Sequence, residues 1–174
     1  MPERKGLVTF GGKPVTLVGD ELGVGDRMPD VVLVGNDMKE AKLGSFAGKV
    51  LVLSAVASLD TSTCDIETRR FNAEAVKLGD DVRVVTVSMD LPFAQKRWCG
   101  AAGVDRVVTL SDHRDAEFGN RFGVLMKENR LLARAVFVVD RQGAVRYIQL
   151  VPEVGQEPDY EAVLAAVREL TVTD

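Results

Sequence analysis

The sequence places a cysteine, Cys64, where a helix is expected to begin. Ser62 and Asp65 have the Ser-x-x-Asp spacing of a capping box, which predicts a helix that starts near Ser62 and covers roughly residues 63–78. Cys64 would then lie in the first turn, among unpaired backbone N–H groups and at the positive end of the helix dipole. Both features favour the thiolate, which is the nucleophilic form of cysteine. Cys64 is therefore a candidate for attack on an electrophilic atom of a substrate.

The phase of this helix would direct the Cys64 sulfur toward the protein interior. One face is expected to carry Cys64, Thr68, Phe71, Ala75 and Leu78. The opposite, solvated face is expected to carry Glu67, Arg70, Glu74 and Lys77. By position alone, Cys64 could equally be a small buried apolar side chain without a reaction, because free cysteines are among the most frequently buried residues.

Arg134 is the most informative residue outside this segment. It is the single cation in an otherwise apolar run that predicts a strand over residues 131–139. A buried charge without a partner is costly, so we expect an anion beside Arg134. The residues alone leave three interpretations open: a structural salt bridge to Asp or Glu, a strand end at which the side chain reaches solvent, and a role in a functional site.

Two further residues could take part in chemistry at Cys64. Thr61 precedes it on the incoming loop, and its hydroxyl offers one donor and two acceptor sites, although a threonine there could also simply cap the helix. Cys99 forms no Cys-x-x-Cys motif with Cys64, so by spacing the two thiols are independent. We expect Trp98 to pack into the core and His113 to lie at the surface, rather than to act in catalysis.

The elements that must position these residues follow an α/β pattern. Residues 50–56 and 82–88 are apolar without alternation, which predicts strands buried on both faces, as in parallel sheets. With the intervening helix they would form a right-handed βαβ unit. A second helix should follow, capped by Asp90 and with Pro92 in its first turn.

Hairpins are expected on both sides of this unit. Residues 7–18 predict an N-terminal hairpin with a glycine turn, and residues 131–139 and 145–151 predict a second hairpin. A helix that opens near Pro158 would follow. A βαβ unit followed by a hairpin and a terminal helix is the order of a thioredoxin-like fold, in which helices flank a central mixed sheet.

Composition limits the classes of function. With 174 residues, 46% apolar and 28% charged, the chain is typical of one soluble domain, residues 1–174. A net charge of −4 without blocks of like charge argues against nucleic acid or an anionic membrane as the main partner. We expect a cytoplasmic protein, because no apolar run reaches about 18 residues and the first residues lack a signal-peptide core. Two cysteines and one histidine argue against structural zinc.

Four stretches of the sequence carry long, specific motifs: Ser58-Leu-Asp-Thr61-x-x-Cys64-Asp-x-Glu-Thr-Arg-Arg-Phe-Asn72, Ser88-Met-Asp-Leu-Pro-Phe-Ala-Gln-Lys-Arg-Trp-Cys99-Gly, Leu131-Leu-Ala-Arg134-Ala-Val-Phe-Val-Val-Asp140 and Glu157-Pro-Asp-Tyr-Glu161. Together they resemble the bacterial thiol peroxidases, a branch of the peroxiredoxins. The resemblance extends from Val8 to about Leu170. It implies a thioredoxin-like fold to which the N-terminal hairpin is added, and a homodimer.

The resemblance also implies roles for single residues. Cys64 matches the peroxidatic cysteine, and Cys99 the resolving cysteine. Arg134 matches the arginine that pairs with the thiolate and with a peroxide oxygen, and Thr61 the threonine that positions the peroxide. The family needs no metal, haem or flavin. One position departs from the family motif Pro-x-x-x-Thr-x-x-Cys, because Ala57 stands in place of the proline.

The function that follows is reduction of hydrogen peroxide and organic hydroperoxides. A Cys64 sulfenic acid would form, condense with Cys99 into an intramolecular disulfide, and be recycled by thioredoxin. The alternative is a redox sensor or thiol-exchange protein of the same fold without efficient peroxide turnover. A non-catalytic interaction module is a third interpretation, for which Ala57 would be a sign of decay. A looser pocket at Ala57 and full compensation by loop packing are equally open.

Overall fold

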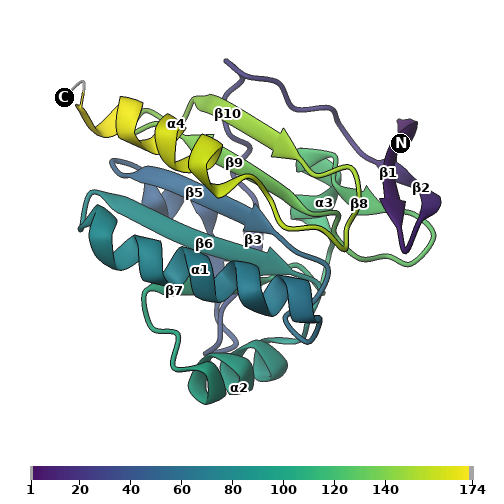
Figure 1. Cartoon of the computed structure of the whole chain (residues 1–174), viewed down its shortest axis with the longest axis horizontal. Helices are drawn as coiled ribbons and strands as arrows, with labels where there is room; N and C mark the ends of the chain where they lie inside the picture. Colours follow the sequence, from purple (N-terminus) through teal and green to yellow (C-terminus); the bar gives the residue numbers. More distant parts are fainter. Residues whose placement is uncertain (1, 173–174) are drawn as a thin grey trace.

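The computed structural model describes residues 2–172, and the centre of this part is a sheet of seven strands (Figure 1). In hydrogen-bonded order they are β10 (Val145–Leu150), β9 (Ala135–Val139), β5 (Val50–Ala55), β6 (Val82–Ser88), β7 (Val107–Ser111), β3 (Val32–Val34) and β4 (Glu40–Lys42). β5, β6 and β7 are parallel, whereas β9 runs antiparallel to both β5 and β10. The sheet is therefore mixed, as the sequence predicts.

The helices cover both faces of this sheet. Within the described residues they are α1 (Ser62–Leu78), α2 (Pro92–Ala102), α3 (Glu117–Phe122) and α4 (Tyr160–Val172), with a 3-10 helix at Leu43–Phe46. α1 and α4 lie on one face, and α2 lies beyond β7 at the lower edge of Figure 1. None of these helices is both long and apolar enough to cross a membrane.

Burial on both faces explains why the central strands do not alternate between apolar and polar residues. Val50 and Val52 of β5 belong to an apolar cluster that includes Phe71 of α1 and residues of α4. Leu51 and Leu53 belong to a second cluster, to which α3 contributes. Because successive side chains of a strand point to opposite faces, a strand between two helical layers must be apolar throughout.

The N-terminal hairpin is built from β1 (Glu3–Phe10) and β2 (Lys13–Val18), and β8 (Leu125–Met126) pairs with β2 as a third strand. Gly11 and Gly12 form the turn with φ of 58° and 81°. A two-residue turn with positive φ at both positions favours glycine, which lacks a Cβ. The hairpin expected over residues 7–18 is confirmed, and its tip lies beside the loop from β10 to α4, where Thr9 bridges to Glu153.

Two local predictions were wrong. The strand expected over residues 131–139 begins at Ala135, because Leu132 bridges to Leu125 instead, so Arg134 lies immediately before β9. Asp90 does not cap α2: the cap residue is Leu91, without a side-chain hydrogen bond, and Pro92 stands in the first turn as predicted.

Candidate active site

Cys64 lies in the first turn of α1 and is fully buried. The cap residue is Thr61, an extended residue whose Oγ1 accepts a hydrogen bond from the Cys64 N–H at 3.3 Å. The capping box expected from Ser62 and Asp65 is absent from the described contacts, because the Asp65 carboxylate accepts hydrogen bonds from Trp98 and Arg69 instead. The placement of the thiol at a buried helix start is nevertheless confirmed.

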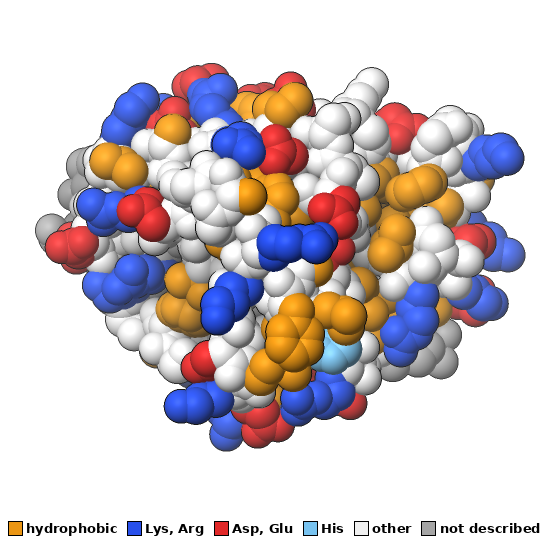
Figure 2. Space-filling model, turned by 90° about the horizontal axis from the view of Figure 1, so that it is seen from below, with side chains coloured by type: hydrophobic (Ala, Val, Ile, Leu, Met, Phe, Trp, Pro, Cys, Tyr) orange, Lys and Arg blue, Asp and Glu red, His pale blue; other side chains and the backbone are white. Residues whose placement is uncertain are grey.

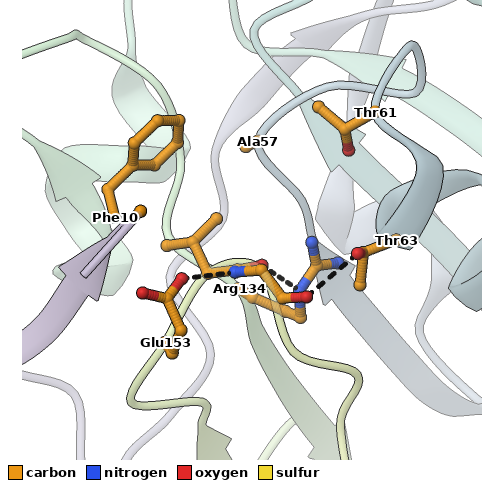
Figure 3. A pocket seen from close by; sticks show the side chains of 9 residues that line it. Phe10, Ala57, Thr61, Thr63, Arg134 and Glu153 are labelled. Atoms are coloured by element: carbon orange, nitrogen blue, oxygen red, sulfur yellow. Dashed lines mark hydrogen bonds between the residues drawn. The ribbon is translucent and has the colours of Figure 1, made fainter.

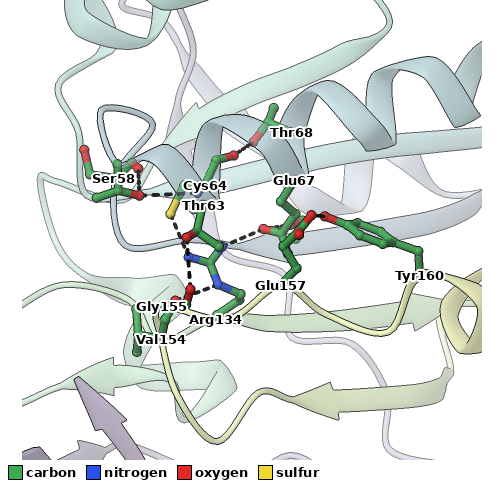
Figure 4. Close-up of polar contacts among 12 residues, drawn as sticks. Ser58, Thr63, Cys64, Glu67, Thr68, Arg134, Val154, Gly155, Glu157 and Tyr160 are labelled. Carbon is green, nitrogen blue, oxygen red and sulfur yellow. Dashed lines mark hydrogen bonds and ion pairs between the residues drawn. The ribbon is translucent and has the colours of Figure 1, made fainter. Parts of the chain in front are cut away.

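Arg134 is the centre of the polar contacts around this thiol (Figure 4). Its guanidinium is 1% exposed and donates in three directions: Nη2 to Cys64 Sγ at 3.1 Å, Nη1 to Glu67 Oε2 at 3.0 Å, and Nε to the Val154 carbonyl at 2.9 Å. The anionic partner that burial demands is therefore present. The interpretation as a salt bridge to a carboxylate is confirmed, and the interpretation as a strand end at which the side chain reaches solvent is wrong. A role in a functional site stays a prediction, which the contact with the Cys64 sulfur supports.

Glu67 is a member of this buried cluster that the sequence analysis missed. The helix phase predicts the solvated face of α1 for Glu67, but its side chain is fully buried and also accepts a hydrogen bond from Ser54 at 3.3 Å. Its other oxygen, Oε1, has no hydrogen-bond partner among the described residues. The signal was its position three residues after Cys64, which places the two side chains on neighbouring parts of one helix face.

Burial and charge oppose each other in this cluster. Burial raises the pKa of Glu67 to about 7, although Arg134 and the Ser54 hydrogen bond act in the opposite direction. Burial by itself would lower the pKa of Arg134, but Glu67 and Cys64 outweigh it, so that pKa is raised. Arg134 is consequently a fixed cation, whereas the charge of Glu67 changes near neutral pH.

A pocket of about 150 Å³ reaches this cluster from the surface (Figure 3). Its walls come from the hairpin tip, the loop before α1, the first turn of α1, the residue before β9 and the loop after β10. The lining residues are Phe10, Gly11, Ala57, Thr61, Thr63, Arg134, Glu153, Val154 and Gly155. Thr61 and Thr63 shortly precede Cys64 in sequence, and Arg134 contacts its sulfur, so the pocket ends next to the thiol. Its size suits a small substrate.

Thr61 caps α1, which is one of the two roles that the sequence left open, and it also lines the pocket. Its Oγ1 caps α1, as described, and donates a hydrogen bond to the Ser58 carbonyl at 2.9 Å. The same hydroxyl lines the pocket. To donate to a substrate, its O–H would have to rotate away from Ser58, which a hydroxyl does at little cost.

Asp90 holds the loop that leads to Thr61. Its Oδ1 accepts a hydrogen bond from Ser58 Oγ at 2.7 Å, and its Oδ2 accepts from Leu59 N at 2.9 Å and Ser88 Oγ at 2.8 Å. The carboxylate expected to cap α2 thus fixes the backbone before Cys64. This contact joins the end of β6 to the loop after β5.

Cys99 is not brought to Cys64. It is a free, half-buried thiol on α2, and its Sγ lies 3.5 Å from Thr109 Oγ1. Its neighbour Trp98 packs against the core with part of its ring, as expected, and donates its indole N–H to Asp65 at 2.8 Å. His113 contacts Ser111 Oγ and stands outside the pocket.

The arrangement can stabilise and use a thiolate. A helix start and a buried guanidinium supply positive potential at the sulfur, and the pocket admits a small electrophile. Within residues 2–172, no three His, Cys, Asp or Glu side chains gather in a way that could hold a metal ion. The contact from Arg134 and the adjoining pocket favour chemistry at the Cys64 sulfur.

Comparisons with known proteins agree with this chemistry. A family model described as Redoxin matches residues 23–164. A thiol peroxidase of Bacillus subtilis (strain 168) is 55% identical over 163 residues, which cover 94% of this chain and 97% of the relative. A thiol peroxidase of Oceanobacillus iheyensis is 54% identical over 158 residues, 91% of this chain and 96% of the relative.

A solved structure supports the same assignment of the fold. The crystal structure of a peroxiredoxin-like protein from Aquifex aeolicus superposes with a TM-score of 0.89 at 45% sequence identity. The superposition covers 95% of this chain and 98% of the Aquifex aeolicus chain. The mixed sheet, its helices and the added hairpin are therefore a thioredoxin-like fold.

Proposed function

Because the chain belongs to the Redoxin family and is a thiol peroxidase, we propose that Cys64 is the sulfur that reduces the hydroperoxide. The observation that carries this proposal is the 3.1 Å contact from Arg134 Nη2 to Cys64 Sγ. The Cys64 thiolate attacks one peroxide oxygen, an S–O bond forms and the O–O bond breaks. The leaving oxygen takes up a proton and departs as water or an alcohol, and Cys64 becomes a sulfenic acid.

Arg134 and Thr61 share the work around the reacting atoms. The Arg134 cation stabilises the thiolate before attack and the negative charge that moves onto the peroxide oxygens during it. The Thr61 hydroxyl, which lines the pocket, positions the peroxide by donating to one oxygen or accepting from its O–H. No separate general base is needed when the thiolate is already formed.

The second half of the cycle uses Cys99. The Cys99 thiol attacks the sulfenic sulfur, a disulfide forms within the chain, and water leaves. Thioredoxin then reduces this disulfide by thiol–disulfide exchange. The support for Cys99 and thioredoxin is membership of the family, together with a reducing cytoplasm as the place where free thiols persist.

We also propose a homodimer. Support comes from apolar side chains at the surface of α1 and α2: Ile66, Leu91 and Phe93 are 51%, 54% and 66% exposed. Figure 2 shows apolar side chains gathered beside the single histidine of the chain. Apolar side chains gathered at a surface mark protein–protein contact sites in many soluble proteins. Phe93→Glu should shift the sedimentation coefficient from that of a dimer to that of a monomer, whereas a monomeric wild type would contradict the proposal.

The decisive experiment is peroxide consumption with thioredoxin and its reductase, followed through loss of NADPH. Wild-type protein should turn over repeatedly with hydrogen peroxide or an alkyl hydroperoxide. Cys64→Ser should be inactive, because a serine hydroxyl is not ionised near neutral pH. Cys99→Ser should undergo a single oxidation and then stop with a trapped sulfenic acid. Continued cycling by Cys99→Ser would remove Cys99 from the mechanism, and a wild type that stops after one oxidation would indicate a sensor.

A further inference from the structure

The loop from β10 to α4 connects the N-terminal hairpin to the Cys64 site. On its outer side, the backbone of Thr9 donates to the Pro152 carbonyl at 2.7 Å, and Val154 N donates to the Thr9 carbonyl at 2.9 Å. On its inner side, the Val154 carbonyl accepts from Arg134 Nε at 2.9 Å, and the Gly155 carbonyl accepts from Thr63 Oγ1 at 3.0 Å. Two consecutive carbonyls of this loop thus hold the guanidinium and the first turn of α1.

Glu153 fixes both sides of this loop with one carboxylate. Its Oε1 accepts hydrogen bonds from Thr9 Oγ1 at 2.9 Å and from Gly12 N at 2.7 Å, and its Oε2 accepts from Gly155 N at 2.7 Å. These bonds, those from the Gly155 and Gly12 backbone first, hold the pKa of Glu153 below its ordinary value. Figure 3 shows Glu153 and Arg134 among the residues that line the pocket, with the Glu153 carboxylate bound to the Gly155 backbone. Glu153 therefore closes the loop on itself and ties it to the hairpin turn.

We propose that Glu153 is a positioning residue for peroxide reduction, which acts by holding the Val154 and Gly155 carbonyls where they orient Arg134 and Thr63. It touches neither the Cys64 sulfur nor any reacting atom. The guanidinium of Arg134 has a fixed fork of donors, and a shift of the Val154 carbonyl therefore turns the donor aimed at Cys64. The proposal rests on the role of Arg134 proposed above, and it gives the hairpin a function in the active site.

The chain contains a matched control for this role. Glu128 binds the same hairpin in the same way, since its two carboxylate oxygens accept from Thr16 N and Thr16 Oγ1, both at 2.8 Å. Its pKa is also lowered, by these bonds to Thr16. Glu128 contacts β2, however, and has no bond to the loop after β10 among the contacts described for it. A change that merely loosens the hairpin should therefore appear equally in Glu128 and Glu153 variants.

The test compares Glu153→Gln with Glu128→Gln. An amide places an NH₂ donor where one carboxylate oxygen accepted, so the substituted side chain would face a backbone N–H with another donor. We expect Glu153→Gln to lower the rate constant for hydrogen peroxide by about three- to tenfold, from loss of charge-assisted hydrogen bonds. The pH midpoint of Cys64 alkylation should move upward, because Arg134 is less well aligned. Glu128→Gln should leave both quantities at the wild-type value.

A double-mutant cycle with Arg134→Met shows whether Glu153 acts through Arg134. In the Arg134→Met background, Glu153→Gln should cause little further loss, because effects that pass through one residue are not additive. The proposal is overturned if the losses in peroxide rate add in the double mutant. It is also overturned if Glu153→Gln leaves the peroxide rate and the alkylation midpoint unchanged, or if Glu128→Gln loses as much as Glu153→Gln. Thr9→Val removes one of the three bonds and should cause a smaller change in the same direction, which serves as the test if Glu153→Gln does not fold.

The two proposals can fail separately. If Arg134→Met alone leaves the alkylation midpoint and the peroxide rate unchanged, the role of Arg134 is wrong. If Arg134→Met changes both and Glu153→Gln changes neither, only the role of Glu153 is wrong.

Discussion

The indole N–H of Trp98 donates a hydrogen bond to Asp65 Oδ1 at 2.8 Å, and each of these residues is the chain neighbour of a cysteine. Arg69 completes the contact: its Nε donates to Asp65 Oδ2 at 2.9 Å, and its guanidinium lies 5.7 Å from the centre of the Trp98 ring. These three side chains join the start of α1 to the end of α2. In the same structure the two sulfurs have different neighbours: Cys64 Sγ contacts Arg134, and Cys99 Sγ lies near Thr109.

This contact should oppose formation of the disulfide. A disulfide needs Cα atoms within about 7 Å and Cβ atoms that face each other, so the first turn of α1 and the end of α2 must rearrange. Trp98→Phe removes the indole donor and keeps an aromatic ring. We expect disulfide formation after a single oxidation to accelerate about fivefold, the equivalent of about 1 kcal/mol for one hydrogen bond. Acid quenching followed by mass spectrometry measures the rate of disulfide formation.

The peroxide step supplies the control for Trp98→Phe. Because the contact lies away from the pocket around Arg134, the rate constant for Cys64 oxidation should not change. Disulfide formation at the wild-type rate, with the fold intact, would show that the Asp65–Trp98 bond does not limit the rearrangement.

Trp98 should also report the redox state, because it is the single tryptophan of the chain. Its emission should change when Cys64 and Cys99 join and its bond to Asp65 opens. In Cys99→Ser the sulfenic acid forms without a disulfide, so the emission should stay close to that of the reduced protein. A full emission change in Cys99→Ser would place the rearrangement before disulfide formation.

Much of the fold could be predicted because it depends on local patterns. The apolar runs of β5 and β6 indicated strands buried on both faces, and Arg134 inside an apolar segment required an anionic partner. The start of α1 placed Cys64 correctly, although the cap is Thr61. Periodicity and the cost of buried charge decide these features, and both can be seen in a sequence.

Apart from the start of β9, the predictions that failed concern carboxylates whose partners come from distant parts of the chain. The phase of α1 predicts a solvated Glu67, but Arg134, far along the sequence, gives it a buried partner. Asp65 and Asp90 had the spacing of helix caps, yet each accepts hydrogen bonds from another segment. Glu153 gave no local signal, because its partners Thr9 and Gly12 belong to the N-terminal hairpin. Tertiary contacts override local propensity at these positions.

Arg134→Met should weaken peroxide reduction strongly. We expect a loss of about 100-fold in the rate constant, as when a preorganised donor is removed from a buried site. The pH midpoint of Cys64 alkylation should rise, since the cation beside the sulfur is gone. Arg134→Lys keeps the charge but cannot form three bonds in a fixed fork, so its loss should be intermediate. Stopped-flow kinetics and alkylation across a wide pH range measure these effects.

Arg146→Met is the control for Arg134→Met. Arg146 forms an ion pair with Asp140, but it is half-exposed and lies on β10 away from the pocket. Arg146→Met should retain the wild-type rate constant for peroxide and the wild-type pH midpoint of Cys64 alkylation. If Arg134→Met also retains both, Arg134 serves only the ion pair with Glu67.

Glu67 should make the stability of the reduced protein decrease as pH rises. Its pKa is raised from 4.5 to about 7 in the folded state, so between these values the folded protein binds more protons than the unfolded chain. The free energy of unfolding therefore falls through this window, by on the order of 3 kcal/mol. Burial raises the pKa of Asp112 to about 6, so Asp112 also makes the free energy of unfolding fall as pH rises, over a lower pH range.

Glu67→Gln isolates this contribution. Glutamine resembles the protonated acid at every pH, so the slope between pH 4.5 and about 7 should become flatter than in the wild type, as measured by urea unfolding. Glu40→Gln, at a side chain that is 66% exposed, should keep the wild-type slope. Identical slopes in wild type and Glu67→Gln would show that Glu67 stays ionised across this range, held by Arg134.

Ala57, which replaces the proline of the family motif, lies on a loop that is held on both sides. Before it, Val56 N donates to the Val87 carbonyl at 3.0 Å, and after it, Ser58 and Leu59 are bound to Asp90. These contacts restrict the loop much as a proline ring would restrict it through φ. Of the two outcomes that the sequence left open, we therefore expect compensation by loop packing and not a looser pocket.

Ala57→Pro tests this argument. If the backbone at Ala57 accepts a proline, the substitution should stabilise the protein by roughly 0.4–1 kcal/mol through the unfolded state and leave the peroxide rate constant unchanged. Asp90→Asn should release the loop and slow the peroxide step, and Ala57→Pro combined with Asp90→Asn should recover part of the loss, because the ring then supplies the restraint. A slower peroxide step in Ala57→Pro alone, with the fold intact, would mean that this loop has a conformation of its own. The pocket beside Thr61 and Cys64 would then depend on alanine at this position.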